Sequence, residues 1–362
     1  MKNNIILITN IPTPYRIPLW DKLINKVLFQ VICISQTEKN RLWKIENRDY
    51  ISFLKSYHFF ISKMDWPIHF TIPFSLFFKL MIKNPDNLII TGYDSFAYWE
   101  ALLYAKIFRK KTILWNGSTL LSSRSKSKIV NLLKKIFIKS FDSFYTYGTE
   151  ATKYLEYFGI NSENIVTGCN CVDTEYFKNN TSNEKSVSDN IQFLYVGQLI
   201  ERKGLENTIK AFSKIKNKNW KLSIIGKGQD EDKLINLVEN FNLKNNVIFE
   251  GFKQKDEIVN YYSQSDVFLM PSYSEVWGLV LNEALASGLF CLSSKYAGAT
   301  IDLIEEGKNG YSIDPLIIED IEEKITKTFQ LDISKKLIKD SFNVNYENEA
   351  NKIIDSIKKA NK

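Results

Sequence analysis

The sequence predicts two α/β domains, each built on a parallel sheet with helices on both faces. Strand-like apolar runs alternate with helical patterns almost throughout the chain, as parallel sheets with crossover helices require. The length of 362 residues exceeds what one compact core suits and fits two domains of about 180 residues each. Hydrophobic residues make up 44% and charged residues 25%, which is ordinary for a globular protein.

The expected strands fall into two groups separated by a polar stretch. The first group is NIILITN, VLFQVICIS, NLIITG, KTILWNG, SFYTYG and NIVTG, and the second is IQFLYVG, KLSIIG, NVIFEG, VFLMPS, FCLSS and YSI. Between them, CVDTEYFKNNTSNEKSVSDN is rich in Asn and Ser and lacks periodicity. We therefore place an N-terminal domain at 1–175, a linker at 176–190, a C-terminal domain at 191–345 and an amphipathic terminal helix at 346–362.

Two glutamates bracket the start of a predicted helix in PSYSEVWGLVLNEALASG, residues 271–288. The run VFLM before it predicts a buried strand, and the apolar spacing after Gly278 predicts a helix. A helix start presents free N–H groups and a partial positive charge, which suit a phosphate. Glu275 precedes that start, and Glu283 lies roughly 7–8 Å along the helix axis. We expect a diphosphate there, with one glutamate near a hexose and the other near a ribose.

These motifs resemble the retaining glycosyltransferases of the family 4 type, which have the GT-B fold of two Rossmann-like domains facing each other across a cleft. The likeness rests on Glu-x7-Glu with its apolar helix and Ala-Ser-Gly. Four further stretches follow in the family's order: FLYVGQLIERKGLENTIKAF, LSIIGKGQDEDKL, NVIFEGF and AGATIDLIEEGKNGY. The resemblance implies sugar transfer with retention, a nucleotide-sugar donor held mainly by the C-terminal domain, an acceptor held by the first domain, and a terminal helix that crosses back to the first domain.

The resemblance also implies roles for individual residues. Lys203 and Glu275 are the expected catalytic residues: Lys203 would neutralise the leaving diphosphate, and Glu275 would hold the donor sugar. Glu283 would hold the ribose. Trp277, Gly278 and Leu279 would offer N–H groups to the phosphates, and Gly251 and Phe252 would contact the base. The full set of expected donor-binding residues is Gly197, Arg202, Lys203, Gly251, Phe252, Glu275, Trp277, Gly278, Leu279 and Glu283.

Two departures from the family pattern concern charge and proton transfer. The family has Arg directly after the first glycine of the turn GQLIERKG, where this chain has Gln198. Arg16, in IPTPYRIP after the first predicted strand, is the candidate to supply the missing charge. Many family members also place a histidine in the first domain near the donor sugar, where this chain has Asn116. The predicted residues on the acceptor or phosphate side are Tyr15, Arg16 and Asn116.

Neither a cofactor nor a metal is expected. The sequence Asp230-Glu-Asp232 looks like a metal-binding pair, but it falls in the first turn of a predicted helix, where acids favour the dipole. The stretch from Gly226 lacks the third glycine of a dinucleotide fingerprint. The four cysteines show no metal-ligand or redox spacing, which indicates a reduced, cytoplasmic protein.

The positive charge is concentrated in the first half of the chain. Residues 1–175 hold 23 Lys/Arg and 14 Asp/Glu, a net charge of +9, which leaves −2 for the remainder of the total of +7. Ten basic residues and no acidic one stand between Glu100 and Asp142. Within this run, SKSKIVNLLKKIFIKS groups apolar side chains, Phe137 among them, on one side of a predicted helix. The pattern suits docking on an anionic membrane surface, and an ordinary domain helix with a basic solvent face is the alternative.

The sequence therefore favours a glycosyltransferase that acts in the cytoplasm as a peripheral protein at the inner face of the cell membrane. The donor would be a UDP- or GDP-linked hexose-type sugar. The acceptor would be a saccharide, lipid-linked or part of a lipopolysaccharide or surface polysaccharide precursor. Nucleic acid is not expected, because no binding motif accompanies the basic charge. Two other classes stay open: a GT-B isomerase acting on the nucleotide sugar, and a catalytically silent sugar-nucleotide-binding subunit.

Overall fold

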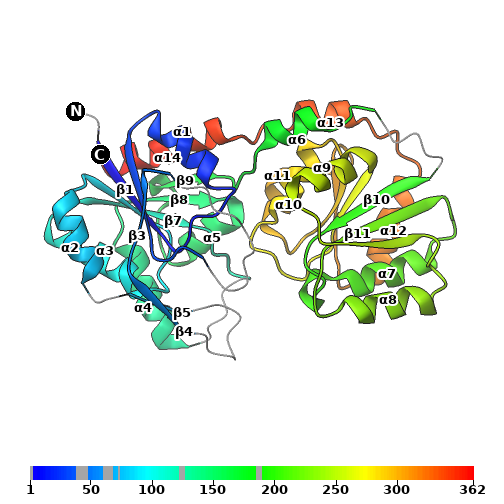
Figure 1. The fold of residues 1–362 in the computed structure, drawn as a ribbon, viewed down its shortest axis with the longest axis horizontal. Helices are drawn as coiled ribbons and strands as arrows, with labels where there is room; N and C mark the ends of the chain where they lie inside the picture. The colour runs from blue at the N-terminus through cyan, green and yellow to red at the C-terminus, as the bar shows by residue number, and fades with distance from the viewer. Residues whose placement is uncertain (1–2, 38–47, 60–67, 72–73, 122–126, 185–189) are drawn as a thin grey trace. The chain divides into compact units, whose positions relative to one another are not determined.

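The computed structural model describes residues 3–37, 48–59, 68–71, 74–121, 127–184 and 190–362. The chain forms two compact units, one of Met1–Cys169 with Tyr346–Lys362 and the other of Asn170–Asn345 (Figure 1). Each unit contains a parallel β-sheet covered by helices. This architecture confirms the prediction of two α/β domains. None of the helices in the described ranges combines the length and the apolar character needed to cross a membrane.

The N-terminal unit is built on a sheet with the strand order β3-β2-β1-β6-β7-β8-β9, in which all neighbours are parallel. Its strands are β1 (Asn4–Thr9), β2 (Leu28–Cys33), β3 (Ile51–Phe53), β6 (Asn87–Ile90), β7 (Lys111–Asn116), β8 (Ser143–Tyr147) and β9 (Ile165–Gly168). Its helices are α1 (Ile17–Ile24), α2 (Ser75–Lys83), α3 (Phe96–Ile107), α4 (Lys128–Lys139), α5 (Thr149–Tyr157), the 3₁₀ turn η1 (Ser162–Asn164) and α14 (Tyr346–Ala360). A separate antiparallel pair joins β4 (Ser56–Phe59) to β5 (Ile68–Thr71). The sequence predicted the strands of the sheet except the short β3, and it did not predict this pair.

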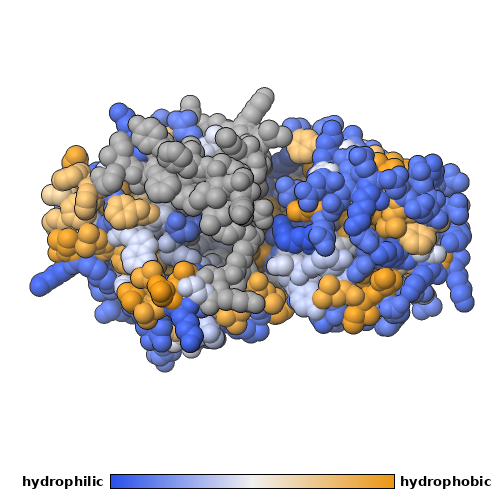
Figure 2. All heavy atoms as spheres, turned by 90° about the horizontal axis from the view of Figure 1, so that it is seen from below, coloured by the Kyte–Doolittle hydropathy of each residue, from blue (hydrophilic) through white to orange (hydrophobic). Residues whose placement is uncertain are grey.

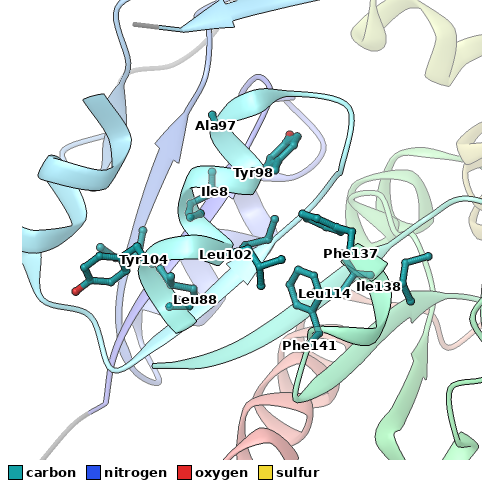
Figure 3. Close-up of a cluster of buried hydrophobic side chains, with 14 of the residues drawn as sticks. Ile8, Leu88, Ala97, Tyr98, Leu102, Tyr104, Leu114, Phe137, Ile138 and Phe141 are labelled. Atoms are coloured by element: carbon teal, nitrogen blue, oxygen red, sulfur yellow. The ribbon is translucent and has the colours of Figure 1, made fainter. Parts of the chain in front are cut away.

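The core of the N-terminal unit joins the central strands to α3 and to the end of α4. Figure 3 shows buried side chains of β1, β6 and β7 together with those of both helices. Phe137 of α4 is fully buried, and its ring centroid lies 4.7 Å from that of Trp99. The other apolar side chains that the sequence grouped with Phe137 are instead exposed: Ile129, Val130, Leu132, Leu133 and Ile136. The C-terminal end of α4 therefore anchors the helix, because the helix meets the core at Phe137 and not in the turns before it.

The C-terminal unit is built on a sheet with the order β12-β11-β10-β13-β14-β15, again parallel throughout. Its strands are β10 (Ile191–Val196), β11 (Trp220–Ile225), β12 (Val247–Gly251), β13 (Val267–Met270), β14 (Phe290–Ser294) and β15 (Gly310–Ile313), all predicted from the sequence. Its helices are α6 (Thr174–Asn180), the 3₁₀ turn η2 (Glu201–Lys203), α7 (Leu205–Lys214), α8 (Glu231–Asn240), α9 (Lys255–Gln264), α10 (Leu279–Ala286), α11 (Gly298–Leu303), α12 (Ile318–Thr328) and α13 (Lys335–Ser341).

The division between the units differs in detail from the predicted boundaries. The C-terminal unit begins at Asn170, a few residues before the predicted end of the first domain at 175. The start of the predicted linker, 176–190, is part of helix α6. The Asp173 side chain caps this helix, and its fully buried Phe177 packs edge-on against Tyr262 at 5.6 Å between ring centroids. Seven residues give too short a periodic pattern to identify such a helix from sequence.

Helix α14 is part of the N-terminal unit although it ends the chain. It packs against α1 and against strands β7, β8 and β9. The buried Glu349 carboxylate on this helix accepts hydrogen bonds from the Tyr145 hydroxyl at 2.6 Å and from the Cys169 N–H at 2.7 Å. The helix therefore holds the last residue of the N-terminal unit before the chain enters the C-terminal unit.

Both sheets reverse their strand order once, between β1 and β6 in the N-terminal unit and between β10 and β13 in the C-terminal unit. In open parallel sheets, ligands bind outside the carboxyl ends of the strands at such a switch point, because the loops there diverge to opposite faces. The residues that follow β1, β6, β10 and β13 are therefore the ones that the fold itself favours for a site.

Candidate functional site

Two loops leave the switch point of the C-terminal unit. The first follows β10 and passes through η2 to Gly204, and the second follows β13 and runs from Pro271 to Gly278. The backbone N–H of Tyr273 donates to the carbonyl of Arg202 at 2.9 Å, so the two loops are tied together. Gly204 has a φ of +71°, and a Cβ there would lie 2.0 Å from the carbonyl oxygen of Pro271. Only glycine allows the loops to approach this closely.

A cluster of charges joins these two loops. The Glu275 carboxylate accepts hydrogen bonds from the Lys203 ammonium and, at 3.4 Å, from Nη1 of Arg202. The side chains of Lys203 and Glu275 are only 17% and 19% exposed, so water screens their attraction weakly. Arg202 Nη1 also donates to the Ser274 carbonyl at 2.7 Å. The structure thus pairs the two residues that the sequence assigned to the diphosphate and to the sugar.

The backbone of Glu275 is fixed as firmly as its side chain. Its N–H donates to the carbonyl of Tyr296 at 3.2 Å, and its own carbonyl accepts from the N–H of Gly298 at 3.1 Å. These bonds form an isolated parallel bridge between Glu275 and Ala297. The carboxylate is therefore presented from a rigid segment, as a positioned binding group requires.

Helix α10 begins where the sequence predicted. Gly278 is its N-cap with a φ of +101°, and Leu279 is its first residue. The first N–H groups of a helix have no partner within the helix, so those near Leu279 are available to an anion. A Cβ at Gly278 would lie 2.5 Å from the Met270 sulfur, which explains the glycine at this cap.

Glu283 lies one turn into α10 and is partly buried. Its Oε2 accepts a hydrogen bond from the Tyr262 hydroxyl at 2.9 Å. Burial raises the pKa of the Glu283 carboxyl to about 7, while the Tyr262 hydrogen bond and the Lys255 charge act in the opposite direction. The carboxyl therefore changes its protonation near neutral pH, which suits a group that exchanges hydrogen bonds with hydroxyls.

The side chain of Trp277, in the loop directly before α10, is buried. Its indole N–H donates to Oδ1 of Asn282 at 2.9 Å, and Nδ2 of Asn282 donates to the carbonyl of Asn170 at 3.0 Å. Both side chains are almost fully buried, at 2% and 0% exposed. The sequence reasoning selected Trp277 for its backbone N–H and missed Asn282. The available signal was a polar amide on the buried, apolar face of a helix.

The remaining donor-side predictions lie on neighbouring strand ends. Gln198 is exposed, and its carbonyl accepts from the Tyr195 hydroxyl at 2.9 Å. A Cβ at Gly197 would lie 2.7 Å from that hydroxyl. Gly251 ends β12 with a φ of +69°, and Phe252 is 53% exposed directly after it. These residues lie at the carboxyl edge of the same sheet, and their contacts with a ligand stay a prediction.

Arg16 lies after β1, at the switch point of the N-terminal unit. Its guanidinium donates to the Tyr147 hydroxyl and, at 3.4 Å, to Oγ1 of Thr9. It also lies 5.5 Å from the ring centroid of Trp115. Within the described residues, three buried polar atoms have no hydrogen-bond partner in this region: Arg16 Nε, Thr13 Oγ1 and Trp115 Nε1. Arg16 is thus held by its own unit and retains a donor to offer.

Asn116 and Tyr15 take part in shaping the loops of the N-terminal unit. Asn116 is 4% exposed, and its amide donates to the carbonyls of Ser118 and Ala151 at 3.1 and 3.3 Å. Its Oδ1 accepts from the Ser118 N–H at 3.2 Å. The Tyr15 carbonyl accepts from the Tyr346 hydroxyl at 3.0 Å. The amide of Asn116 therefore has partners on both sides in this structure.

The acidic stretch after β11 forms the start of a helix, as predicted. Asp230 is the N-cap of α8, and Glu231 and Asp232 fall in its first turn. Across the described part of the chain, no group of three or more His, Cys, Asp or Glu side chains is arranged to hold a metal ion.

Comparison with known proteins concerns first the unit that holds these loops, the paired charges and the helix start. Residues 177–342 match the model of the family described as Glycosyl transferases group 1. The match lies within the C-terminal unit, Asn170–Asn345, and contains every residue of the predicted donor site.

Among similar proteins is an uncharacterized glycosyltransferase of Methanocaldococcus jannaschii, 34% identical over 128 residues, which are 35% of this chain and 33% of that protein. The amylovoran biosynthesis glycosyltransferase AmsK of Erwinia amylovora is 33% identical over 129 residues, 33% of this chain and 31% of that protein. The chain thus spans about a third of the length of each of these relatives.

Two solved structures resemble the whole chain. The lipopolysaccharide outer core galactosyltransferase WaaB, in its apo form, has a TM-score of 0.73 with 18% identity and covers 98% of this chain and 99% of its own. Anabaena HepE in complex with UDP has a TM-score of 0.71 with 14% identity and covers 99% of this chain and 97% of its own. These likenesses show the GT-B fold that the motifs predicted.

Proposed function

We propose that this protein is a glycosyltransferase that moves a hexose-type sugar from a nucleotide-diphosphate donor to a saccharide acceptor. The observation that carries the proposal is the Lys203–Glu275 pair beside the start of α10, at the switch point of the sheet. The matching family model and the UDP complex of the structurally similar HepE support a nucleotide-sugar donor.

The charges of the site suit the departure of a diphosphate. Negative charge develops on the leaving phosphate oxygens, and a fixed cation with aligned N–H groups stabilises it. Lys203 supplies the cation, and the N–H groups near Leu279 supply the helix start. When a diphosphate attracts Lys203, the Glu275 carboxylate loses that partner and can accept hydrogen bonds from sugar hydroxyls. Donor binding in this proposal therefore exchanges one ion pair for two ligand contacts. We also propose that the anomeric configuration of the sugar is retained, on the basis of the family resemblance alone.

Arg16 is proposed to supply a second cation, in the role that Gln198 cannot fill. Its Nε and the indole N–H of Trp115 are buried donors that lack a partner in the described residues. Buried donors of this kind cost stability unless something accepts from them. A phosphate oxygen of the donor or a hydroxyl of the acceptor would satisfy them.

The acceptor is proposed to be a lipid-linked or surface-polysaccharide precursor, reached at the inner face of the cell membrane. Helix α4 exposes Ile129, Leu132, Leu133 and Ile136 beside the exposed cations Lys128, Lys135 and Lys139. Figure 2 shows hydrophobic side chains at the surface of the N-terminal unit on the face seen from below. An interfacial helix combines such apolar and basic side chains, and each lysine near an anionic surface contributes about 1 kcal/mol.

Vesicle co-sedimentation tests the membrane proposal. Changing Lys128, Lys134, Lys135 and Lys139 together to Ser should abolish binding to anionic vesicles, and high salt should weaken binding of the unchanged protein. The matched control changes four exposed lysines of the C-terminal unit to Ser: Lys214, Lys216, Lys308 and Lys336. Binding that responds neither to salt nor to the first set would make a soluble acceptor the better proposal.

Turnover of a radiolabelled donor with membrane extract tests the activity. Label that moves to a saccharide or lipid fraction supports a transferase, a changed nucleotide sugar indicates the isomerase, and donor that stays intact indicates the silent subunit. Thermal-shift screening with UDP-, GDP- and ADP-sugars selects the donor, because a ligand at a hundred times its Kd stabilises by about 2.7 kcal/mol.

A further inference from the structure

A buried chain of hydrogen bonds runs from the phosphate side of the donor loop to the first residue of the C-terminal unit. The indole N–H of Trp277 donates to Asn282, and Asn282 donates to the carbonyl of Asn170. Trp277 lies directly before the cap of α10, and Asn170 is where the chain enters the unit. Asn282 lies between them with no exposed surface.

The chemistry of this chain requires an amide at 282. An indole N–H can only donate and a backbone carbonyl can only accept, so the residue between them needs one acceptor and one donor. Asn supplies both, and the two partners fix which way its amide points. A leucine would match the apolar neighbours Leu281 and Ala284 but would leave both partners unsatisfied. An aspartate could accept from the indole, but its carboxylate would face the Asn170 carbonyl.

Asn170, whose carbonyl Asn282 binds, directly follows Cys169, whose N–H is bound by a residue of the N-terminal unit. The Cys169 N–H donates to Glu349 of α14, and the next residue, Asn170, accepts from Asn282 of α10. Each unit therefore fixes its own side of the point where the chain passes from one unit to the other.

We propose that Asn282 is a positioning residue for the donor diphosphate and couples the donor loop to the Cys169–Asn170 connection. Through the Trp277 indole it sets the orientation of the N–H groups at Trp277, Gly278 and Leu279. Through Asn170 it transmits a change in that loop to the chain connection. The inference rests on the proposed function, because the ligand that these N–H groups would meet is the nucleoside diphosphate.

Affinity for UDP, GDP and ADP measured by calorimetry gives the first test. Asn282→Asp and Trp277→Phe should each weaken the binding of the preferred nucleotide about tenfold. The double variant should bind no more weakly than the worse single one, since both changes break the same chain. Asn309→Asp is the matched control. Like Asn282, this buried amide accepts one hydrogen bond and donates another: it accepts from the Glu305 N–H at 2.8 Å and donates to the Leu303 carbonyl at 2.9 Å.

Hydrogen exchange of the peptide that contains Cys169 and Asn170 gives the second test. The measured quantity is the change in exchange rate when nucleotide binds, which a merely structural role of Asn282 would not affect. Nucleotide binding should slow exchange of these amides in the unchanged protein and in the Asn309→Asp control, but not in Asn282→Asp. Unchanged nucleotide affinity in Asn282→Asp, or an equal loss of affinity in the Asn309→Asp control, would overturn this inference and leave the proposed function standing. If the unchanged protein bound none of the three nucleotides, the donor site and this inference would both be overturned.

Discussion

The ammonium of Lys203 donates a hydrogen bond to the carboxylate of Glu275, across the two loops that leave β10 and β13. The pair joins the cation expected on the diphosphate to the acid expected on the sugar. In the absence of a donor, each residue therefore satisfies the charge of the other. Because of this pairing, we expect a change at Glu275 to affect turnover and nucleotide affinity differently.

Glu275→Gln should lower turnover about a hundredfold or more while leaving UDP affinity unchanged or higher. The donor sugar loses an ionised acceptor, whereas Lys203 loses a competitor for the diphosphate. Steady-state kinetics and calorimetry measure the two effects. The control is Glu206→Gln, which removes another lysine-paired carboxylate of the C-terminal unit, bonded to Lys210 and Lys233 at 2.6 Å each. A loss of UDP affinity as large as that in Glu283→Gln would contradict the assigned roles.

The affinity for a nucleotide sugar should rise between about pH 6 and about pH 8. The Glu283 carboxyl has a pKa of about 7 because of burial, and its ionised form accepts hydrogen bonds from ribose hydroxyls more strongly. UDP-glucose is the suitable probe, since its diphosphate has no group that titrates in this range. Calorimetry should show a rise of several-fold that Glu283→Gln abolishes. The same rise in the variant would assign the pH dependence to another group.

Thermal stability should depend on Glu283 over a defined pH interval. The folded pKa of about 7 lies above the ordinary value of 4.5, so between these values the folded protein keeps a proton that the unfolded chain releases. The stability contribution therefore falls as pH rises from about 4.5 to about 7 and is constant above it. Glu283→Gln, whose amide oxygen can still accept from Tyr262, should gain stability relative to the unchanged protein over this interval, on the order of 1–3 kcal/mol. Melting curves at several pH values check this, and a constant difference would refute it.

Arg16→Ala should slow turnover at least tenfold if Arg16 supplies the cation that Gln198 lacks. Gln198→Arg should then restore part of the lost rate, because it places a cation after the first glycine of the turn. Arg48→Ala is the control, since Arg48 is a cation of the same unit that pairs with Asp21 at 3.5 Å. Normal turnover in Arg16→Ala, or no restoration in the double variant, would remove Arg16 from the proposed site.

Gly204→Ala should destabilise the C-terminal unit more than Gly307→Ala does. Both glycines have a left-handed φ, of +71° and +75°. A Cβ at 204 would lie 2.0 Å from the Pro271 carbonyl oxygen, whereas at 307 the nearest atom, on the Tyr311 ring, is 3.9 Å away. Gly307→Ala should therefore cost about 1–2 kcal/mol from the backbone conformation alone. The excess cost of Gly204→Ala, measured by thermal unfolding, reports the contact between the two loops, and equal costs would argue against it.

Much of the fold follows from local patterns. The strands of the C-terminal sheet are continuous apolar runs, and α10 begins at Gly278 as its spacing predicts. The elements that sequence reasoning missed are short: β3 has three residues, and α6 depends on the Asp173 cap and on Phe177 packing against Tyr262. Tertiary contacts stabilise such elements, and no local period records them.

The sequence by itself determined where most strands and helices follow one another along the chain. It also determined which glycines permit tight loops and which acids and cations are candidates at the strand ends. Each of these depends on neighbours in sequence. The tertiary structure alone decided that Lys203 pairs with Glu275 and that the Trp277 indole reaches Asn170 through Asn282. It also decided that α4 buries Phe137 and Ile138 while exposing the apolar side chains of its earlier residues, such as Ile129. Partners in the first two cases come from distant segments, and burial in the third depends on which turn of the helix meets the core. A one-dimensional pattern specifies which face of a helix is apolar, but only the packed chain specifies what that face contacts.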